Sequence, residues 1–253
     1  MWHTFLDSSS FVLIFCLLLI FSIGSGIFCA TLYKKKSNWE SSGIENSIVG
    51  IFALIISFTF LQAGNAHRDR SVNIHKEANY IDMMYRYSKE LPDSFYRYTK
   101  GELLNFLSAQ LSYEKSHDEQ FFYRAKLVSD AYWSKLRKYK NQKSNSPYVD
   151  QVNKVSECFD HIQSAVSLNA YSYYERTPSF VMFLLIVISL LIGFLVGFMN
   201  GIKSKIHFLV PFIYFVLIAL TMMVISDLNN PRLGLIKPSF HHLQITYDYI
   251  SKD

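Results

Sequence analysis

The chain has 253 residues, of which 50% are hydrophobic and only 18% are charged. Soluble domains carry roughly 25% charged residues, so this composition argues against an ordinary soluble protein. The formal net charge of +5 is too modest to indicate nucleic-acid binding. The three cysteines, two of them in one apolar stretch, fit neither a disulfide framework nor a metal site.

Charged residues are almost absent from four windows, each about 20 residues long and therefore able to cross a hydrocarbon core of roughly 30 Å as a helix. The windows are 11–33, 46–66, 179–200 and 206–226. The first has no basic residue before it and no small-residue cleavage site after it, which favours a retained anchor over a signal peptide. The sequence predicts an all-α integral membrane protein with four transmembrane helices. Buried helices of a soluble protein are the alternative.

The second predicted helix continues beyond the membrane. No proline interrupts residues 47–90, and Pro92 then stops the helix. About 44 helical residues at 1.5 Å each would reach roughly 65 Å, so about half of the helix would protrude into water. Its polar half keeps a helical rhythm of apolar side chains: Val72, Ile74, Ala78, Ile81, Met84 and Tyr85.

The segment 67–177 is predicted to be an extramembrane helical domain inserted between the second and third membrane helices, giving a 2 + 2 layout. Its further helices are expected near 94–111, 118–140 and 148–175. The remaining domains are 1–66, 178–227 and a C-terminal tail, 228–253. The side chains expected to face inward are Phe95, Leu103, Phe106, Leu107, Phe122, Leu127, Trp133, Leu136, Val152, Val155, Phe159 and Ile162.

The charge of the short loops predicts an orientation. Lysines crowd the first loop at 34–36 and recur in the second at Lys203 and Lys205. Because basic residues of short loops favour the cytoplasm, both short loops are expected there, with the helical domain and the termini outside. Arg68, Arg70 and other basic residues beside the second helix favour the opposite orientation.

Polar residues on the second membrane helix suggest a conduit. Ser57, Asn65 and Arg68 share roughly one face, which becomes apolar towards Leu54. Polar groups in membrane helices tend to face a bundle interior or a watery cavity, so these four residues are candidate pore-lining residues. Alternatively, the residues from Asn65 onward simply lie at the membrane interface.

Small residues recur at spacings that place them on one helix face in three of the membrane helices. Such stripes let helix backbones approach closely in lipid. They could serve packing within one subunit or contacts between subunits around a pore. The small residues are Ser22, Gly26 and Ala30 in the first membrane helix; Gly50, Ala53, Ser57 and Gly64 in the second; and Gly193, Gly197 and Gly201 in the third.

Metal and enzyme motifs are not predicted. His75 and Glu77 are two residues apart and would point away from each other on a helix, as would the adjacent His241 and His242. His67 completes no ligand set with them. No phosphate loop, nucleophile elbow or pair of catalytic carboxylates is found, so neither an enzyme nor a bound cofactor is expected.

The stretch SDLNNPRLG, 226–234, follows the last apolar window. Asp227 is predicted where the helix leaves the hydrocarbon, with Arg68, Arg70 or Arg176 as candidate ion-pair partners. Pro231 prevents the helix from continuing, and Gly234 permits a turn. A structural corner is one interpretation; a direct role in ion passage is the other.

Two stretches of the sequence carry a family resemblance: residues 50–92, with the Glu77-Ala78 pair, and residues 227–240, with DLNNPRLG. They resemble the bestrophin-like family of four-span, mainly bacterial membrane proteins, a family named as a domain of unknown function. The resemblance singles out Glu77, Asp227, Pro231 and Gly234 as motif residues and implies a cell-membrane location. Asn229 stands where the family pattern has a second acid. True bestrophins are pentameric anion channels lined by their second membrane helices, with a cytosolic middle domain, so the resemblance also implies a homo-oligomer.

Two functions follow from these observations. The first is an oligomeric, anion-favouring ion channel whose second helix lines the pore and whose partners are lipid, copies of itself and inorganic ions. The second is a non-conducting, membrane-anchored interaction or sensory protein that acts through its helical domain.

Overall fold

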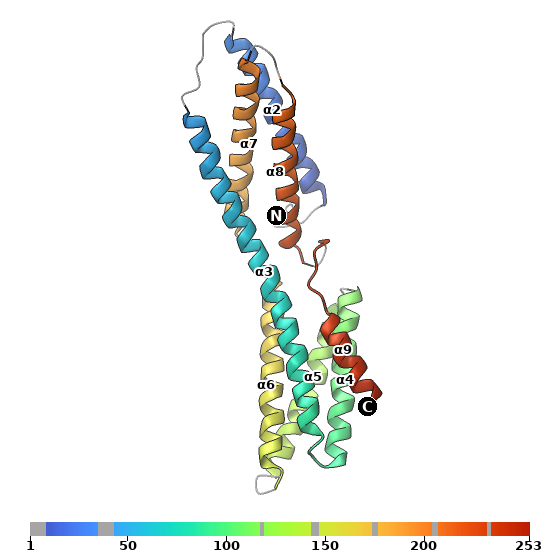
Figure 1. The fold of residues 1–253 in the computed structure, drawn as a ribbon. Helices are drawn as coiled ribbons and strands as arrows, with labels where there is room; N and C mark the ends of the chain where they lie inside the picture. Colours follow the sequence, from blue (N-terminus) through green and yellow to red (C-terminus); the bar gives the residue numbers. More distant parts are fainter. Residues whose placement is uncertain are drawn as a thin grey trace. The chain divides into compact units, whose positions relative to one another are not determined.

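The computed structural model describes residues 9–34, 43–116, 119–142, 147–173, 177–203, 207–231 and 234–253. These residues form eight α-helices and no strand, so the all-α prediction is confirmed for the described chain (Figure 1). The helices are α2 (Ser9–Lys34), α3 (Ile44–Ser88), α4 (Asp93–Ser116), α5 (Glu119–Gln142), α6 (Val149–Ser172), α7 (Ser179–Ile202), α8 (Leu209–Leu228) and α9 (His241–Lys252).

Four of these helices are long and apolar enough to cross a membrane. The candidate spans are Phe11–Tyr33, Asn46–Ser88, Ser179–Ile202 and Leu209–Leu228. The second is much longer than a bilayer requires, because α3 runs without a break to Ser88. We therefore treat α3 as crossing the membrane only up to His67, since Arg68, Asp69 and Arg70 follow in succession.

The chain divides into two compact units. The membrane unit comprises Met1–His67 and Glu175–Lys237, and the helical unit comprises Arg68–Tyr174 and Pro238–Asp253. Helix α3 contributes its first half to the membrane unit and its second half to the helical unit.

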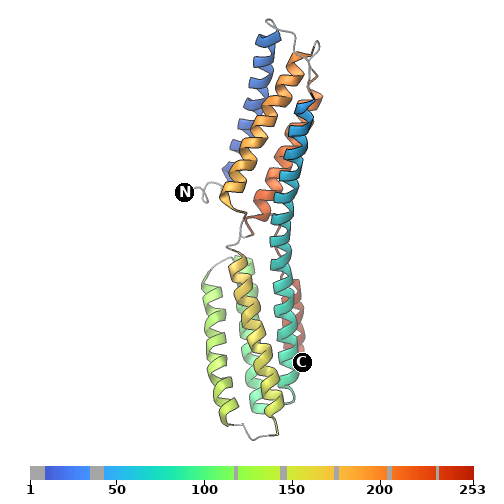
Figure 2. The same ribbon diagram turned by 90° about the vertical axis from the view of Figure 1, so that its left-hand side faces the viewer.

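Within the membrane unit, α2 and α7 pack backbone against backbone, as both views show (Figure 2). A Cβ added to Gly197 would lie 2.1 Å from the carbonyl oxygen of Ile23, and one added to Gly26 would lie 2.1 Å from that of Phe194. The hydroxyl of Ser22 also donates to the Leu190 carbonyl at 2.5 Å. The small residues of α2 and α7 thus serve packing within one chain, the first of the two alternatives.

The glycines of α3 behave differently. A Cβ added to Gly50 or Gly64 would meet nothing within 4 Å among the described residues. These two glycines of α3 are therefore not used to approach another helix of the described chain.

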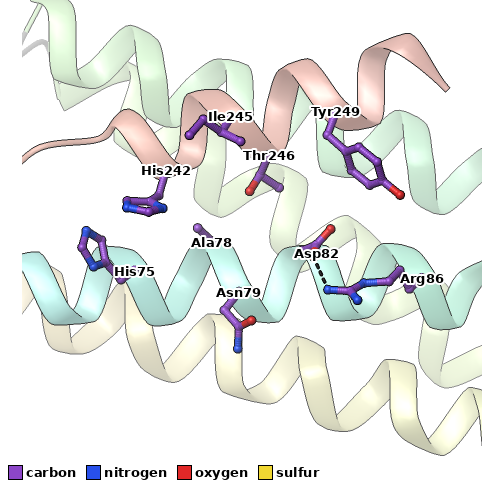
Figure 3. A pocket seen from close by; sticks show the side chains of 9 residues that line it. All are labelled: His75, Ala78, Asn79, Asp82, Arg86, His242, Ile245, Thr246 and Tyr249. Carbon is purple, nitrogen blue, oxygen red and sulfur yellow. Dashed lines mark hydrogen bonds and ion pairs between the residues drawn. The ribbon is translucent and has the colours of Figure 1, made fainter.

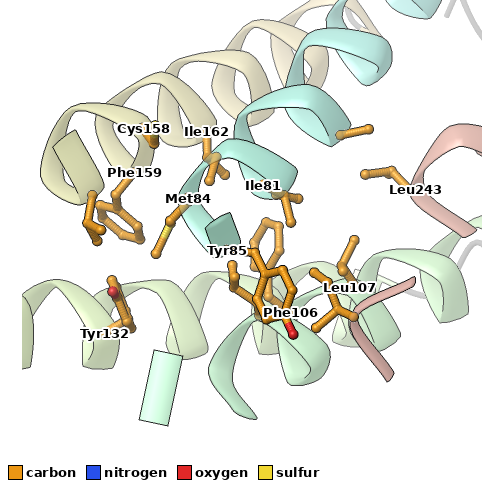
Figure 4. Close-up of a cluster of buried hydrophobic side chains, with 14 of the residues drawn as sticks. Ile81, Met84, Tyr85, Phe106, Leu107, Tyr132, Cys158, Phe159, Ile162 and Leu243 are labelled. Carbon is orange, nitrogen blue, oxygen red and sulfur yellow. The ribbon is translucent and has the colours of Figure 1, made fainter. Parts of the chain in front are cut away.

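The helical unit has a continuous apolar core built from the second half of α3, α4, α5, α6 and α9 (Figure 4). Most of the side chains predicted to face inward are buried there. The buried ones are Ile74, Ala78, Ile81, Met84, Tyr85, Phe95, Leu103, Phe106, Leu107, Leu136, Val152, Val155, Phe159 and Ile162.

Three of the predicted core positions are wrong. Leu127 is 69% exposed, and Trp133 and Val72 are also exposed. On α5 the inward face carries Ala125, Ser129, Tyr132 and Leu136, an alternation of four and three residues that keeps one stripe on one side. Leu127 and Trp133 lie off that stripe, and the side chain of Phe122 lies outside the described residues.

The last helix, α9, was not predicted, because residues 228–253 were expected to form only a C-terminal tail. It is short and polar on average, but Leu243 and Ile250 are fully buried and join the core of the helical unit, with Phe240 just before them. A 12-residue helix is marginal by itself, and this packing is what stabilises it.

Candidate functional site

The four candidate pore-lining residues lie on one uninterrupted helix, α3. Leu54, Ser57, Asn65 and Arg68 are all exposed and fall on one side of the helix. The 14 steps from Leu54 to Arg68 span about 21 Å along the axis, most of the thickness of a hydrocarbon core. The stripe is therefore long enough to line much of a path across a membrane.

The opposite side of the same segment is buried. Phe52, Thr59 and Ala63 have exposed fractions of 3%, 2% and 1%, and they lie about half a turn away from the Leu54–Arg68 stripe. Helix α3 thus uses one face for packing inside the chain and leaves the stripe unoccupied by the other described helices.

A surface groove of about 640 Å³ runs along this exposed side within the membrane unit. Leu54 and Asn65 line it, but Ser57 and Arg68 are not among its lining residues. Its walls are mostly apolar, with polar groups towards Asn65: Ile51, Leu54, Ile55, Phe58, Thr59, Leu61, Gln62, Asn65 and Val181.

The Ser57 hydroxyl is engaged by its own helix. It donates to the Ala53 carbonyl at 2.8 Å, a bond that satisfies a serine in an apolar environment. The Ser57 hydroxyl therefore has a hydrogen-bond partner within its own helix and does not need water as a partner.

Two arginines mark the polar end of the stripe, and they differ. Arg68 is exposed, and its Nε lies 3.8 Å from the carboxylate of Asp69, which is also exposed. Arg70, which the sequence made a candidate partner of Asp227, is fully buried in the helical unit, and its Nε donates to the Ser172 carbonyl at 3.0 Å. Arg70 therefore fixes α3 to α6, and only Arg68 remains as a cation of the stripe.

Glu77, singled out by the family pattern, lies in the core of the helical unit. It is 1% exposed, and Gln110 of α4 donates from Nε2 to its Oε1 at 3.1 Å. Burial raises the pKa of Glu77 to about 8, against the opposing effect of the Gln110 bond. Near neutral pH the protein therefore holds a mainly protonated carboxyl group between α3 and α4.

Gln110 was missed by the sequence analysis. It follows Leu103 and Leu107 on the buried face of α4, so a polar side chain interrupts an otherwise apolar stripe. Buried polar groups need partners, and this interruption was the available clue that α4 supplies a hydrogen bond to a polar group of another helix.

The stretch after α8 forms a hydrogen-bonded corner, which we call the Asp227 corner (residues 227–231 and 234–236). The two carboxylate oxygens of Asp227 accept the backbone N–H groups of Leu235 and Ile236 at 2.6 and 2.7 Å. A Cβ added to Gly234 would lie 2.7 Å from the Asp227 carbonyl, so only glycine fits this turn. Pro231 is buried beside it.

The partners of Asp227 are thus backbone amides, where the sequence analysis expected an arginine. Arg176, one of those arginines, lies outside the described residues. A carboxylate suits the corner because two successive backbone N–H groups beyond α8 both need acceptors.

Asn229 links the same corner to the beginning of α7. Its side-chain oxygen accepts the backbone N–H of Thr177 at 3.1 Å and the Thr177 hydroxyl at 3.0 Å. These bonds need one acceptor oxygen, which an amide supplies as well as a carboxylate does. The replacement of the family's second acid therefore leaves this connection intact.

The sequence model of the bestrophin-like domain matches residues 43–237, from the residue before α3 to the end of the Asp227 corner. The chain belongs to the bestrophin-like family. The resemblance that residues 50–92 and 227–240 indicated is confirmed. No curated protein and no solved structure matches the chain. With four helices apolar enough to span a bilayer, this bestrophin-like chain is a multi-pass membrane protein.

Proposed function

We propose that the protein is a homo-oligomeric ion channel in which the membrane half of α3 lines the conducting path. The observation that carries the proposal is the two-sided character of this segment. One face packs inside the chain through Phe52, Thr59 and Ala63, and the other presents the Leu54–Arg68 stripe.

An oligomer is part of the proposal because the groove of α3 lies open along the side of a single chain. Copies arranged around an axis would bring their α3 stripes together, as the second helices of true bestrophins are arranged. A pentamer is proposed by that analogy. Cyclic assemblies of identical subunits are the simplest way to close a ring.

The chemistry of the stripe favours anions. Arg68 is an exposed cation at its polar end, and a ring of such side chains raises the local concentration of anions. The neighbouring Asp69 reduces this field, so the preference is expected to be moderate. Leu54, further into the membrane, supplies an apolar ring that can close by excluding water.

The spans are proposed to follow the 2 + 2 layout, with the helical unit on one side of a cell membrane, bacterial by analogy with the family. Loop lysines favour the helical unit outside, whereas the bestrophin analogy favours it in the cytosol. A cysteine introduced at Ser146 and tested with a membrane-impermeant thiol reagent in intact cells decides between the two orientations, with Cys16, Cys29 and Cys158 replaced by serine.

The decisive experiment is ion flux through the purified full-length protein in liposomes, with halide and potassium efflux measured in parallel. We expect halide efflux to exceed potassium efflux. Arg68→Glu should lower the halide-to-potassium ratio at least about fivefold, because it reverses the charge at the mouth of the path.

Arg97→Glu is the matched control. Arg97 is an equally exposed arginine paired with an aspartate on α4, outside the stripe, and its replacement should leave the ratio unchanged. Absence of flux from correctly folded oligomers would remove the channel proposal. Equal ratios for Arg68→Glu and the wild type would remove Arg68, and with it the α3 stripe, from the conducting path.

A second function is favoured by one observation in the helical unit. Leu127 and Tyr123, one turn apart on α5, are 69% and 60% exposed, and exposed apolar pairs suit a protein partner. A non-conducting interaction or sensory protein would use this face. A monomer in mild detergent that passes no ions would favour it over the channel.

A further inference from the structure

Two histidines from distant parts of the chain meet in the helical unit. His75 of α3 and His242 of α9 have ring centroids 4.2 Å apart, with their planes inclined by 58° (Figure 3). Both side chains are exposed. They lie at one end of a recess of about 500 Å³ between the two helices, which Asn79, Asp82 and Thr246 also line.

The apolar core fixes this juxtaposition. Each histidine is next in sequence to a fully buried residue: His75 to Ile74 on α3, and His242 to Leu243 on α9. Both buried residues belong to the same core cluster. The backbone positions of the two imidazoles are therefore set by packing, while the rings themselves remain free to turn towards water.

We propose that His75 and His242 form a binding site for a divalent transition-metal ion such as Zn²⁺, Ni²⁺ or Cu²⁺. Imidazole nitrogen is a preferred ligand of all three ions. The site would join the C-terminal helix α9 to α3.

The distance between the rings fits shared coordination. With metal–nitrogen bonds of about 2.0 Å and tetrahedral angles, two imidazoles on one ion have centroids roughly 5 Å apart. The observed 4.2 Å differs by less than 1 Å, which a small rotation of two exposed side chains supplies. A metal therefore requires no movement of either helix.

Two imidazoles do not complete a coordination shell. Among the described residues, no three His, Cys, Asp or Glu side chains are grouped closely enough to hold a metal together. Asp82 also lines the recess, but its carboxylate is paired with Arg86. Water or a small anion would therefore fill the remaining positions, as it does in open metal sites.

The sequence did not reveal this pair. On α3 the residue two positions from His75 is Glu77, and on α9 the neighbour of His242 is His241, so each local pair points apart. The ligands come from helices separated by more than 150 residues and meet only because α9 packs onto α3.

The test uses full-length protein in detergent after treatment with a chelator. Zn²⁺ and Ni²⁺ are titrated by calorimetry, and the thermal unfolding midpoint is measured with and without each ion. We expect one saturable site per chain and a raised midpoint, because an ion that binds only the folded state stabilises it.

His75→Ala and His242→Ala should each weaken the binding roughly 100-fold, because a site with two linked ligands becomes a site with one. The control is His161→Ala. His161 lies on α6, stacked on Tyr80 at 4.5 Å, and its loss should leave binding unchanged. Far-ultraviolet circular dichroism of each variant verifies that it is folded.

Two results would overturn the proposal. One is the absence of saturable binding to folded wild-type protein. The other is wild-type affinity in both folded variants, His75→Ala and His242→Ala, which would place the ion elsewhere. If His75→Ala fails to fold, His242→Ala alone decides, since His242 is an exposed residue in the first turn of α9.

Discussion

The two units of the protein differ in their exposed surfaces: the membrane unit leaves many more large apolar side chains exposed than the helical unit does. In the membrane unit, large apolar side chains such as Phe21, Phe58 and Phe180 are more than 70% exposed, and glycines lie at the closest helix contacts. In the helical unit, residues such as Leu107 and Ile81 are fully buried. The difference fits a different solvent for each unit. Lipid is as apolar as leucine, so membrane helices associate mainly through close packing and hydrogen bonds, whereas water drives large side chains inward.

The largest expected effect comes from filling the α2–α7 contact. Gly197→Leu places a side chain where a single carbon would already lie 2.1 Å from the Ile23 backbone. Because backbone cannot move aside as a side chain can, the cost should exceed about 4 kcal/mol. Fluorescence-detected size-exclusion chromatography after heating in detergent should show little folded protein.

Gly64→Leu is the matched control on α3. A Cβ there would meet nothing within 4 Å among the described residues, so the monomer should remain folded. Equal losses in the two variants would contradict the distinction between packed and unpacked glycines.

The next effect concerns the buried carboxyl of the helical unit. Because the pKa of Glu77 is raised from 4.5 to about 8 on folding, the unfolded chain releases this proton at lower pH than the folded protein does. The free energy of unfolding should therefore fall as pH rises from about 4.5 to 8 and then level off.

Glu77→Gln removes this titration while keeping a polar side chain beside Gln110. The variant should be less sensitive to pH across that range and more stable than the wild type at pH 7 by about 3 kcal/mol. Thermal unfolding midpoints between pH 4.5 and 8 measure the effect. Glu90→Gln, an exposed change on the turn after α3, should follow the wild-type curve.

The Asp227 corner predicts a smaller loss in the membrane unit. Asp227→Asn keeps the shape but removes the charge and one acceptor oxygen, so one of the Leu235 and Ile236 N–H groups loses its partner. The expected cost is about 2 kcal/mol, seen as a lower unfolding midpoint in detergent. Asp130→Asn, an exposed change on α5, provides the comparison, and an equal shift in both variants would count against the corner.

The smallest effect is expected at a position that the sequence analysis placed in the core. Leu127→Gln should change the free energy of unfolding by less than about 0.5 kcal/mol, because Leu127 is 69% exposed. Chemical denaturation of the full-length protein, followed by circular dichroism, measures it. A large destabilisation would show that this face of α5 is covered in the assembled protein.

The sequence predicted most of the helices because their patterns are long and periodic. Four apolar windows, one uninterrupted α3 and the α4–α6 segments are all found within a few residues of the expected ends. The core of α4 was predicted for the same reason. On α5, aromatic and aliphatic residues occur on several faces, so the sequence did not distinguish the buried stripe of Tyr132 and Leu136 from exposed Leu127 and Trp133.

The sequence by itself thus determined the class of protein, because transfer of some twenty apolar residues into lipid depends on composition and length alone. It also determined the family, through residues 43–237. The tertiary structure decided the partners: Gln110 for Glu77, backbone amides for Asp227, Ser172 for Arg70, and His242 for His75. Each of these contacts joins residues that are neighbours only after folding, and Asp227 meets its amides only because the chain turns back at Gly234.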